Sequence, residues 1–258
     1  MTDHEVTVAV PFYGDSRLVQ RCVRSLRRQT HRDMRILVIG DGQRPRLYTK
    51  DPRVQFYTLP ENKGAYFARA VALAATETPF HGVVDADDWV DPEWAEQLLA
   101  TGGDAVQHGY FTFEEDSGPR LKRWSRARSA VLPRFVHYAP HIGIYTTERL
   151  RAAGGYSPAF RMGYDSLLSA VLRLQGPVSI VDEPTYHRAI LPDSLSNAEA
   201  TRIGSPARQR IKDQLSDTYL RAYRARRNPA RVREIVHRLT PRALWDEVSE
   251  HAEIVRQG

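Results

Sequence analysis

Hydrophobic positions change their spacing several times along the first hundred residues of the chain. Short apolar runs rich in β-branched residues predict buried strands. Longer segments with apolar residues at every third or fourth position predict amphipathic helices. Strands are predicted at residues 6–11, 34–39, 54–59 and 81–85, and helices at 15–30, 64–76 and 92–100. This alternation is typical of an α/β fold with a mostly parallel central sheet flanked by helices.

The pattern changes again in the last quarter of the chain. Three helical segments rich in arginine follow Pro206, and they are divided by Pro229 and Pro241, because proline interrupts a helix. We therefore expect two regions, an α/β domain over residues 1–200 and a basic helical C-terminal appendage over residues 201–258.

Polar side chains gather where the predicted strands end. Tyr13 and Asp15 follow the first strand, Asp41 follows the second, and Asp85 and Asp87 follow the fourth. In parallel sheets of this kind, ligands bind beyond the carboxyl ends of the strands. The sequence therefore predicts a ligand site along this edge of the sheet.

Composition narrows the class of protein. The chain has 258 residues, 41 % of them hydrophobic, which is an ordinary globular mix that excludes a largely disordered or fibrous protein. Its single cysteine, Cys22, excludes an intrachain disulfide and cysteine–metal clusters. No apolar run is long enough for a transmembrane helix, and the first residues lack a secretory signal, so we expect a cytoplasmic protein.

The net charge of the chain is compatible with several classes of binding partner. Lys and Arg number 37 and Asp and Glu 31, a formal charge of +6. A basic protein can bind nucleic acid, a membrane surface or a small anionic substrate, and charge alone does not choose among them.

The densest chemical signal is the acidic run Asp85-Ala86-Asp87-Asp88 after the fourth predicted strand. Carboxylates held this close repel one another unless a cation or strong hydrogen-bond donors compensate. Oxygen ligands favour Mg²⁺ or Mn²⁺ over zinc. The alternative is that Asp88 or Asp91 caps the next helix.

Six short segments also share their order and spacing with a known family. They are Val8–Tyr13, Val38–Gln43, Asn62–Gly64 with Ala68-Arg69, Asp85–Asp88, Gly154–Asp165 and Tyr186–Ser196. Together they resemble the motifs of the family 2 nucleotide-sugar glycosyltransferases, which have the GT-A fold. The resemblance implies a Rossmann-like sheet and transfer of one sugar, with inversion, from a nucleoside-diphosphate sugar to an acceptor hydroxyl. UDP is the favoured donor nucleotide. Gly40, Gln43 and Tyr164 depart from the family's usual residues, which leaves the substrate open.

The same resemblance assigns the donor site. The residues that it places on the nucleotide sugar are Pro11, Tyr13, Asp41, Lys63, Arg69, Asp85, Ala86, Arg188 and Ser194. Several of these also have ordinary structural interpretations. Tyr13 could be a core aromatic, Asp41 a turn residue beside Gly42, and the two basic residues Lys63 and Arg69 part of a solvated helix face.

The resemblance further implies a metal and a base. Asp87 would bind Mg²⁺ or Mn²⁺ directly, and His187 could join the metal shell. Asp165, at the start of a predicted helix after a glycine-rich loop, would be the general base that deprotonates the acceptor. The alternative is that Asp165 only caps that helix.

Two other classes of function make different demands on the sequence. A sugar nucleotidyltransferase or a dinucleotide-dependent dehydrogenase needs a glycine-rich loop after the first strand, and this chain has one glycine and an acid there. A non-enzymatic alternative is a protein that binds nucleic acid or an anionic surface through its basic C-terminal helices. These helices could also make a peripheral membrane contact or a homodimer. The arginines concerned are Arg221, Arg224, Arg226, Arg227, Arg231 and Arg233.

Overall fold

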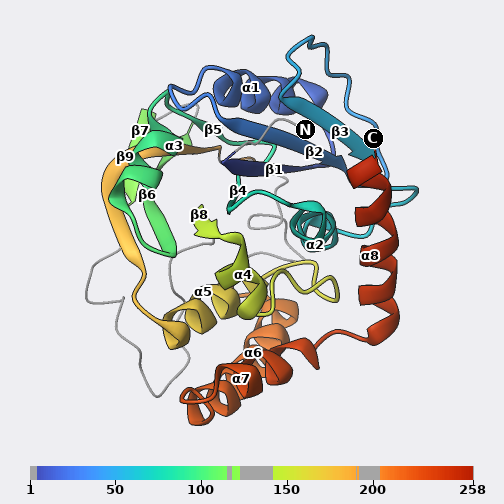
Figure 1. Cartoon of the computed structure of the whole chain (residues 1–258), viewed down its shortest axis with the longest axis vertical. Coiled ribbons are helices and arrows are strands. Elements are labelled where there is room, and N and C mark those ends of the chain that lie inside the picture. Colours follow the sequence, from blue (N-terminus) through green and yellow to red (C-terminus); the bar gives the residue numbers. More distant parts are fainter. Residues whose placement is uncertain (1–4, 115–117, 123–141, 190, 192–203, 258) are drawn as a thin grey trace.

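A nine-stranded mixed sheet forms the centre of the computed structural model (Figure 1). The structure describes residues 5–114, 118–122, 142–189, 191 and 204–257. The strand order is β3-β2-β1-β4-β8-β6-β9-β5, and β7 pairs with β6 outside this path. Helices cover both faces of the sheet, so the predicted α/β class is confirmed.

One half of the sheet is parallel. Its strands are β1 (Val6–Phe12), β2 (Met34–Gly40), β3 (Val54–Thr58) and β4 (Phe80–Val83). Val6 of β1 lies opposite Met34 of β2 on one side and opposite Phe80 of β4 on the other. These are the four strands predicted from the apolar runs, and their carboxyl ends meet at one edge of the sheet.

The other half is mixed. Its strands are β5 (Trp89–Val90), β6 (Ala105–Glu114), β7 (Gly118–Lys122), β8 (Gly143–Thr146) and β9 (Ser179–Ala189). Antiparallel β8 joins this half to β4, and β9 runs parallel to β6. At its end β9 pairs with the short strand β5, where His187 lies opposite Trp89. This pairing brings β9 beside the acidic run that precedes β5.

Five helices pack on the sheet in the described part of the first 175 residues. They are α1 (Ser16–Arg27), α2 (Ala65–Ala75), α3 (Trp94–Thr101), α4 (Thr147–Ala152) and α5 (Tyr164–Gln175). Asp15 caps α1, because its carboxylate accepts a hydrogen bond from the Arg17 backbone N–H at 2.8 Å. Helix α3 begins two residues later than its predicted start at Pro92.

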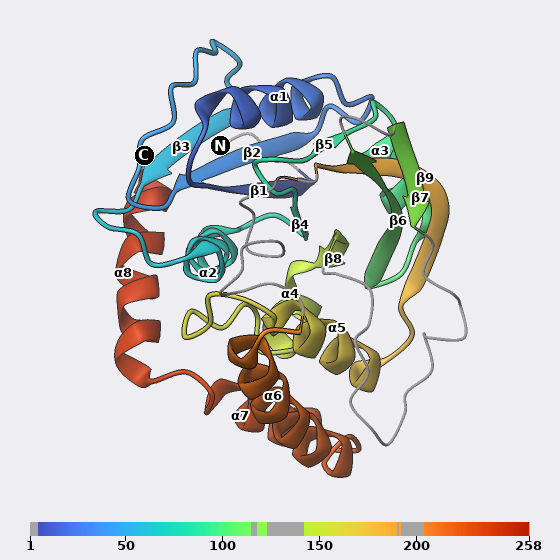
Figure 2. The same ribbon diagram turned by 180° about the vertical axis from the view of Figure 1, so that it is seen from behind.

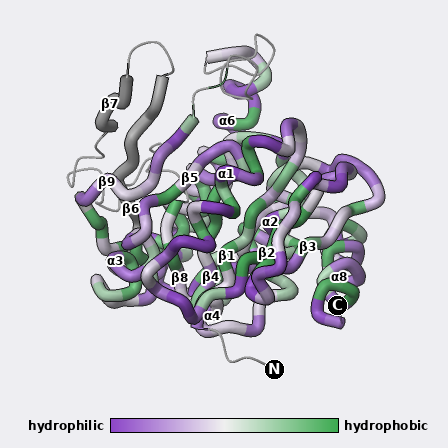
Figure 3. Tube along the Cα trace, turned by 90° about the horizontal axis from the view of Figure 1, so that it is seen from above, coloured by the Kyte–Doolittle hydropathy of each residue, from purple (hydrophilic) through white to green (hydrophobic). Residues whose placement is uncertain are grey.

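Two apolar cores lie on the two faces of the sheet, and the front and back views show the helices that cover these faces (Figures 1 and 2). Val8 and Val10 of β1 face the core shared with α1 and α3, whereas Ala9 faces the core shared with α2, α4 and α5. The strands are therefore buried on both faces, and hydrophobic residues gather on the central strands (Figure 3). This explains why they are continuous apolar runs rather than alternating ones.

Three further helices follow residue 204, as predicted. They are α6 (Pro206–Arg224), α7 (Pro229–His237) and α8 (Arg242–Gln257). Helix α8 packs against α2, and α6 packs against α5. Apolar residues of all three helices belong to the core beneath α2 and α5. The division into two regions at residue 200 stays a prediction. No helix in the described ranges is long and apolar enough to cross a membrane.

Candidate functional site

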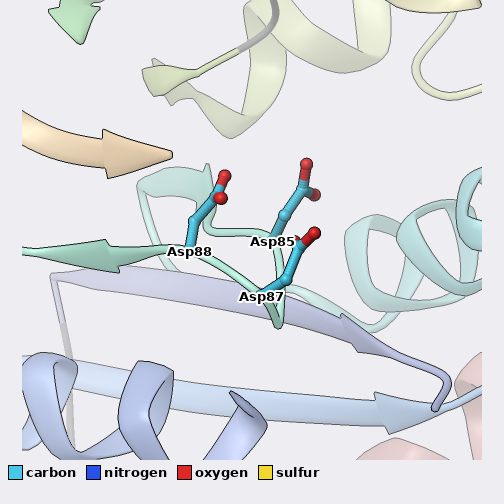
Figure 4. A group of neighbouring side chains, drawn as sticks. All are labelled: Asp85, Asp87 and Asp88. Atoms are coloured by element: carbon cyan, nitrogen blue, oxygen red, sulfur yellow. The ribbon is translucent and has the colours of Figure 1, made fainter. Parts of the chain in front are cut away.

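Three aspartates meet in the turn between β4 and β5. Oxygen atoms from the carboxylates of Asp85, Asp87 and Asp88 lie within 4.8 Å of one another. The backbone N–H of Asp88 donates to the carbonyl of Asp85 at 2.9 Å, and this tight turn directs all three side chains to the same side (Figure 4). The acidic run thus forms a compact group of oxygen donors at the carboxyl edge of the sheet.

Asp88 is held by β9. The residue is 1 % exposed, and its carboxylate accepts hydrogen bonds from the Tyr186 hydroxyl at 2.7 Å and the Ala189 backbone N–H at 2.9 Å. The first residue of α3 is Trp94, and no side-chain cap precedes it. The alternative in which Asp88 or Asp91 caps this helix with its side chain is therefore wrong, because β9 engages Asp88 instead.

The three carboxylates disturb one another electrostatically. Burial, together with the charge of Asp85, raises the pKa of Asp87 to about 6. Burial and the charges of Asp87 and Asp85 raise the pKa of Asp88 well above its usual value. A divalent cation would relieve this repulsion, and hard oxygen donors suit Mg²⁺ or Mn²⁺. The residues present therefore fit such an ion.

Arg69 of α2 neutralises part of this charge. Its side chain is buried, its guanidinium forms an ion pair with Asp85, and it lies 5.0 Å from the ring centre of Tyr66. Burial alone would lower the pKa of Arg69, but the charge of Asp85 holds that pKa above its usual value. The interpretation of Arg69 as part of a solvated helix face is wrong, because α2 turns it inward.

Asp165 lies in the first turn of α5, but it does not cap the helix. The N-cap position belongs to Gly163, whose φ of 79° is left-handed. The Asp165 carboxylate accepts a hydrogen bond from the Tyr66 hydroxyl at 2.8 Å. The same hydroxyl accepts from the Asp165 backbone N–H at 3.1 Å. The capping alternative is therefore wrong.

Tyr66 is a site residue that the sequence analysis missed. It precedes Arg69 by three positions in α2, so the two side chains lie on one face of the helix. Through them, one helix contacts both Asp165 and Asp85. The available signal was this spacing from Arg69, but nothing local to Tyr66 indicates that it reaches α5.

Asp41 fastens the loop that leads into α2. It is 3 % exposed, and its two oxygens accept from the backbone N–H groups of Lys63 at 2.6 Å and Gly64 at 2.8 Å. Gly42 takes the left-handed conformation, with a φ of 71°, and a Cβ there would lie 2.4 Å from the Asn62 backbone nitrogen. No described residue other than glycine has a positive φ. Asp41 is thus a buried anchor for the loop that leads into α2.

Lys63 and Tyr13 differ in their surroundings. The Lys63 ammonium lies 3.0 Å from the carboxylate of Glu61 and 2.6 Å from that of Glu247 in α8. Tyr13 is 67 % exposed beyond the end of β1, so its interpretation as a core aromatic is wrong. Pro11 is buried in β1 opposite Ile39 of β2.

His187 lies beside the acidic group without joining it. Its ring stacks on Trp89 with centroids 5.2 Å apart, and its Nε2 lies 2.9 Å from the Asp91 carboxylate. Within the described ranges, the acidic residues grouped closely enough for a metal are Asp85, Asp87 and Asp88 alone. A metal role for His187 stays a prediction.

The structure describes two of the three remaining residues that were predicted to contact the nucleotide sugar. Ala86 is half-buried within the acidic turn, and Arg188 is half-buried on β9, where its charge acts to lower the pKa of Asp87. Ser194 lies outside the described residues.

Arg21 of α1 is a second residue that the sequence analysis missed. It donates to the backbone carbonyl of Asp87 at 2.5 Å, and its guanidinium lies 4.1 Å from the ring centre of Trp89. Arg21 therefore supports the acidic turn from the opposite side to Arg69. The sequence predicted only that Arg21 lies within a helix.

Fold and site together define an α/β protein with a candidate cation site at the carboxyl edge of its sheet, and comparison with known proteins gives the family. The model of "Glycosyl transferase family 2" matches residues 7–163, more than half of the chain. The chain belongs to this family. The predicted family is thereby confirmed, and the predicted enzyme class agrees with it.

Named relatives share a limited part of their length with this chain. It is 30 % identical over 125 residues to EpsH of Bacillus subtilis (strain 168), which is 45 % of this chain and 36 % of EpsH. It is 27 % identical over 129 residues to glycosyltransferase GlyA of Streptococcus pneumoniae serotype 4, which is 46 % of this chain and 18 % of GlyA. The chain thus spans about a third or less of these relatives.

A solved structure confirms the fold over almost the whole chain. Residues 1–349 of S. aureus TarS, in complex with UDP-GlcNAc, align with a TM-score of 0.63 and 15 % identity. The alignment covers 98 % of this chain and 90 % of that one. At this identity the likeness establishes the GT-A architecture.

Proposed function

We propose that this protein transfers one sugar from a UDP-sugar to an acceptor hydroxyl and inverts the anomeric configuration. One observation supports this function above the others. A single helix, α2, contacts the acidic turn through Arg69 and the candidate base Asp165 through Tyr66. The groups that would stabilise the charge of the leaving group and the group that would accept the proton are therefore linked by one helix at the same edge of the sheet.

The donor would lie along the carboxyl edge of β1, β2 and β4. In the family resemblance, Pro11, Tyr13 and Asp41 hold the base, and Lys63 and Arg69 contact the nucleotide. UDP is supported as the nucleotide by the family and by the UDP-GlcNAc bound to the similar TarS fold. The nucleotide sugar would meet Arg188 and Ser194 at its diphosphate, where an arginine can make paired hydrogen bonds.

Asp87 would hold a divalent cation, with Asp85 and Asp88 beside it. A bound Mg²⁺ or Mn²⁺ would neutralise negative charge that grows on the departing diphosphate. Arg69 keeps Asp85 oriented, and Tyr186 keeps Asp88 oriented, so the oxygen donors are arranged before any ligand arrives.

Asp165 would accept the proton of the attacking hydroxyl. General base catalysis of this kind contributes a factor of about 10²–10⁴ to the rate. The hydrogen bond from Tyr66 sets the direction of the carboxylate. Attack by an activated hydroxyl on the face opposite the leaving group inverts the anomeric carbon.

Donor hydrolysis tests the function without knowledge of the acceptor. We expect UDP with Mn²⁺ to raise the melting temperature more than GDP or dTDP, and a chelator to remove the difference, because a ligand of the native state stabilises it. With a UDP-sugar, water should slowly replace the acceptor, and rapid NMR should detect the free sugar first as the opposite anomer. A first product of retained configuration would exclude direct displacement, and the absence of any UDP binding would exclude the donor assignment.

A further inference from the structure

The positive charge of the chain is concentrated on two helices that the proposed reaction does not use. Residues 204–240, which contain α6 and α7, hold ten Lys and Arg residues and three Asp and Glu residues, an excess of seven. The whole chain has an excess of only six. The following helix, α8, is acidic, with two arginines and four acids. The rest of the protein therefore carries almost no net charge.

Four of these arginines surround one cavity between α6 and α7. The cavity is a hollow open to solvent, with a volume of about 390 Å³, and its lining consists of Arg221, Arg224, Ala225, Arg231, Ile235 and Arg238. Glu234 forms ion pairs with both Arg231 and Arg238. Among the residues described, Arg221 and Arg224 have no carboxylate within 4.0 Å. The cavity is thus lined by four guanidinium groups, and the one carboxylate paired with them, that of Glu234, offsets a single positive charge.

We propose that this cavity binds a phosphate ester group of the acceptor, an inference that rests on the proposed glycosyl transfer. Guanidinium groups make paired, charge-assisted hydrogen bonds to phosphate oxygens. The cavity volume falls within the range of about 300–1,000 Å³ that is usual for small-ligand pockets. A phosphomonoester or phosphodiester would supply the negative charge that Glu234 alone does not.

The cavity lies at a fixed distance from the candidate base. The side chain of Ile211, near the start of α6, lies 3.5 Å from the position that a Cβ of Gly163 would occupy, and Gly163 is the N-cap of the helix that carries Asp165. Arg224 follows Ile211 by 13 residues, which is about 20 Å along a helix. We therefore infer an extended acceptor whose phosphate lies on the order of 20 Å from its reactive hydroxyl.

A dissolved phosphate ester suits this surface better than a bilayer or duplex DNA. Helices that lie on membranes combine basic residues with exposed large apolar side chains. The large hydrophobic side chains exposed in the described ranges are Tyr13, Tyr48, Phe56 and Ile254, and none of them is on α6 or α7. Four arginines around one hollow can surround one phosphate group, whereas a protein that binds duplex DNA spreads its basic residues over several phosphates along the helix.

Paired charge variants test the proposal. The probe is a fluorescent glycerol phosphate oligomer, a simple phosphodiester chain, measured by anisotropy at 150 mM salt. We expect Arg221→Gln/Arg224→Gln to weaken its binding at least tenfold. The matched control, Arg227→Gln/Arg233→Gln, removes two exposed arginines from the same segment that do not line the cavity, and we expect less than a twofold change.

Each contrary result overturns the proposal. Equal losses in the two double variants would mean diffuse charge attraction rather than a site. Stronger binding to anionic vesicles or to duplex DNA than to the oligomer would assign the arginines to a membrane or to nucleic acid. Absence of oligomer binding by the unchanged protein, with UDP binding intact, would reject the cavity alone.

A parallel titration with UDP and Mn²⁺ separates this proposal from the proposed function. Oligomer binding without UDP binding would reject the UDP-sugar donor but leave the phosphate site supported. Melting curves of both double variants verify folding, since all four arginines are exposed.

Discussion

At the scale of single residues, aspartates of the same type differ in their chemistry because their surroundings differ. Asp88 is buried and bound to β9. Asp87 is half-buried, with a pKa raised to about 6 by burial and by Asp85. Asp165 is half-buried, oriented by a tyrosine hydroxyl. These environments favour a structural role for the first, a cation ligand for the second and a proton acceptor for the third.

Replacement of Asp87 tests the cation site. Asp87→Asn removes one negative charge from the group of oxygen donors, so we expect Mn²⁺-dependent binding of UDP to weaken by at least about tenfold. Isothermal calorimetry with and without Mn²⁺ measures this. Asp213→Asn is the matched control, because Asp213 is exposed on α6 and its carboxylate accepts a hydrogen bond from the Gln209 side-chain amide at 2.8 Å. Unchanged UDP affinity in the Asp87 variant would remove this residue from the site.

The Tyr66 hydroxyl is expected to act through Asp165. Tyr66→Phe keeps the ring and removes the hydrogen bond, so we expect kcat to fall about tenfold, equivalent to about 1.4 kcal/mol, while KM for the donor stays the same. Tyr57→Phe removes a hydroxyl that bonds His251 instead and should leave kcat unchanged. A double variant Tyr66→Phe/Asp165→Asn should lose no more activity than Asp165→Asn. Fully additive losses would show that Tyr66 acts independently of Asp165.

At the scale of elements, the site is assembled by one helix and one strand. Helix α2 contacts Asp85 and Asp165 through two side chains three positions apart. Strand β9 holds the acidic turn, because the Tyr186 hydroxyl donates to Asp88 and accepts from the Asp85 backbone N–H at 3.2 Å. Relative movement of α2 and β9 would therefore change the spacing of the carboxylates.

Two buried tyrosines allow a matched test of this strand contact. Tyr186→Phe removes a hydroxyl that has two partners, and we expect the free energy of unfolding to fall by about 1–3 kcal/mol. Tyr164 is equally buried, but its hydroxyl has no hydrogen-bond partner in the described ranges. Tyr164→Phe should therefore leave stability unchanged or raise it. Urea unfolding measures both variants, and equal effects would contradict the proposed support of the acidic turn.

At the scale of the whole molecule, the C-terminal helices brace the helices that carry the site. Helix α8 packs on α2 and contributes Glu247 to Lys63, and α6 packs on α5. Their apolar side chains belong to the same core as Phe67 and Leu167. The stability of the site therefore depends on residues far from it in the sequence, and global unfolding is the appropriate measure.

The pH dependence of stability is one such global property. His81 is fully buried on β4, and burial lowers its pKa to about 3, whereas an unfolded histidine titrates near about 6.5. Between these values the unfolded chain binds more protons, so this residue makes stability fall on acidification, by up to about 1.4 kcal/mol per pH unit. Above pH 7 it has no such effect.

A variant isolates this contribution from that of Asp87. The raised pKa of Asp87 acts in the opposite direction, because its folded form binds a proton more readily than the unfolded chain. We therefore compare the unchanged protein with His81→Gln in denaturant titrations from pH 7 to pH 4. As the pH falls, the unfolding free energy of the unchanged protein should decrease relative to that of the variant. A difference between the two proteins that does not depend on pH would contradict a neutral buried His81.

The sequence by itself determined the parallel half of the sheet, the helices around it and the acidic turn. Each of these depends on residues close together in the chain, so periodicity and spacing are sufficient to predict them. The motif order also identified the family correctly. It did not reveal the surroundings of individual side chains, which is why the capping alternatives for Asp88 and Asp165 were wrong.

Only the tertiary structure decided which distant residues meet. Tyr66 and Asp165 are 99 positions apart, and Tyr186 and Asp88 are 98 apart. Arg21 reaches the Asp87 carbonyl from a helix 66 positions earlier. The basic tail was visible as composition, but its cavity exists because α6 and α7 pack together and bring four arginines to one hollow. Contacts of this kind follow from the packing of complete elements, and no local pattern in the sequence encodes them.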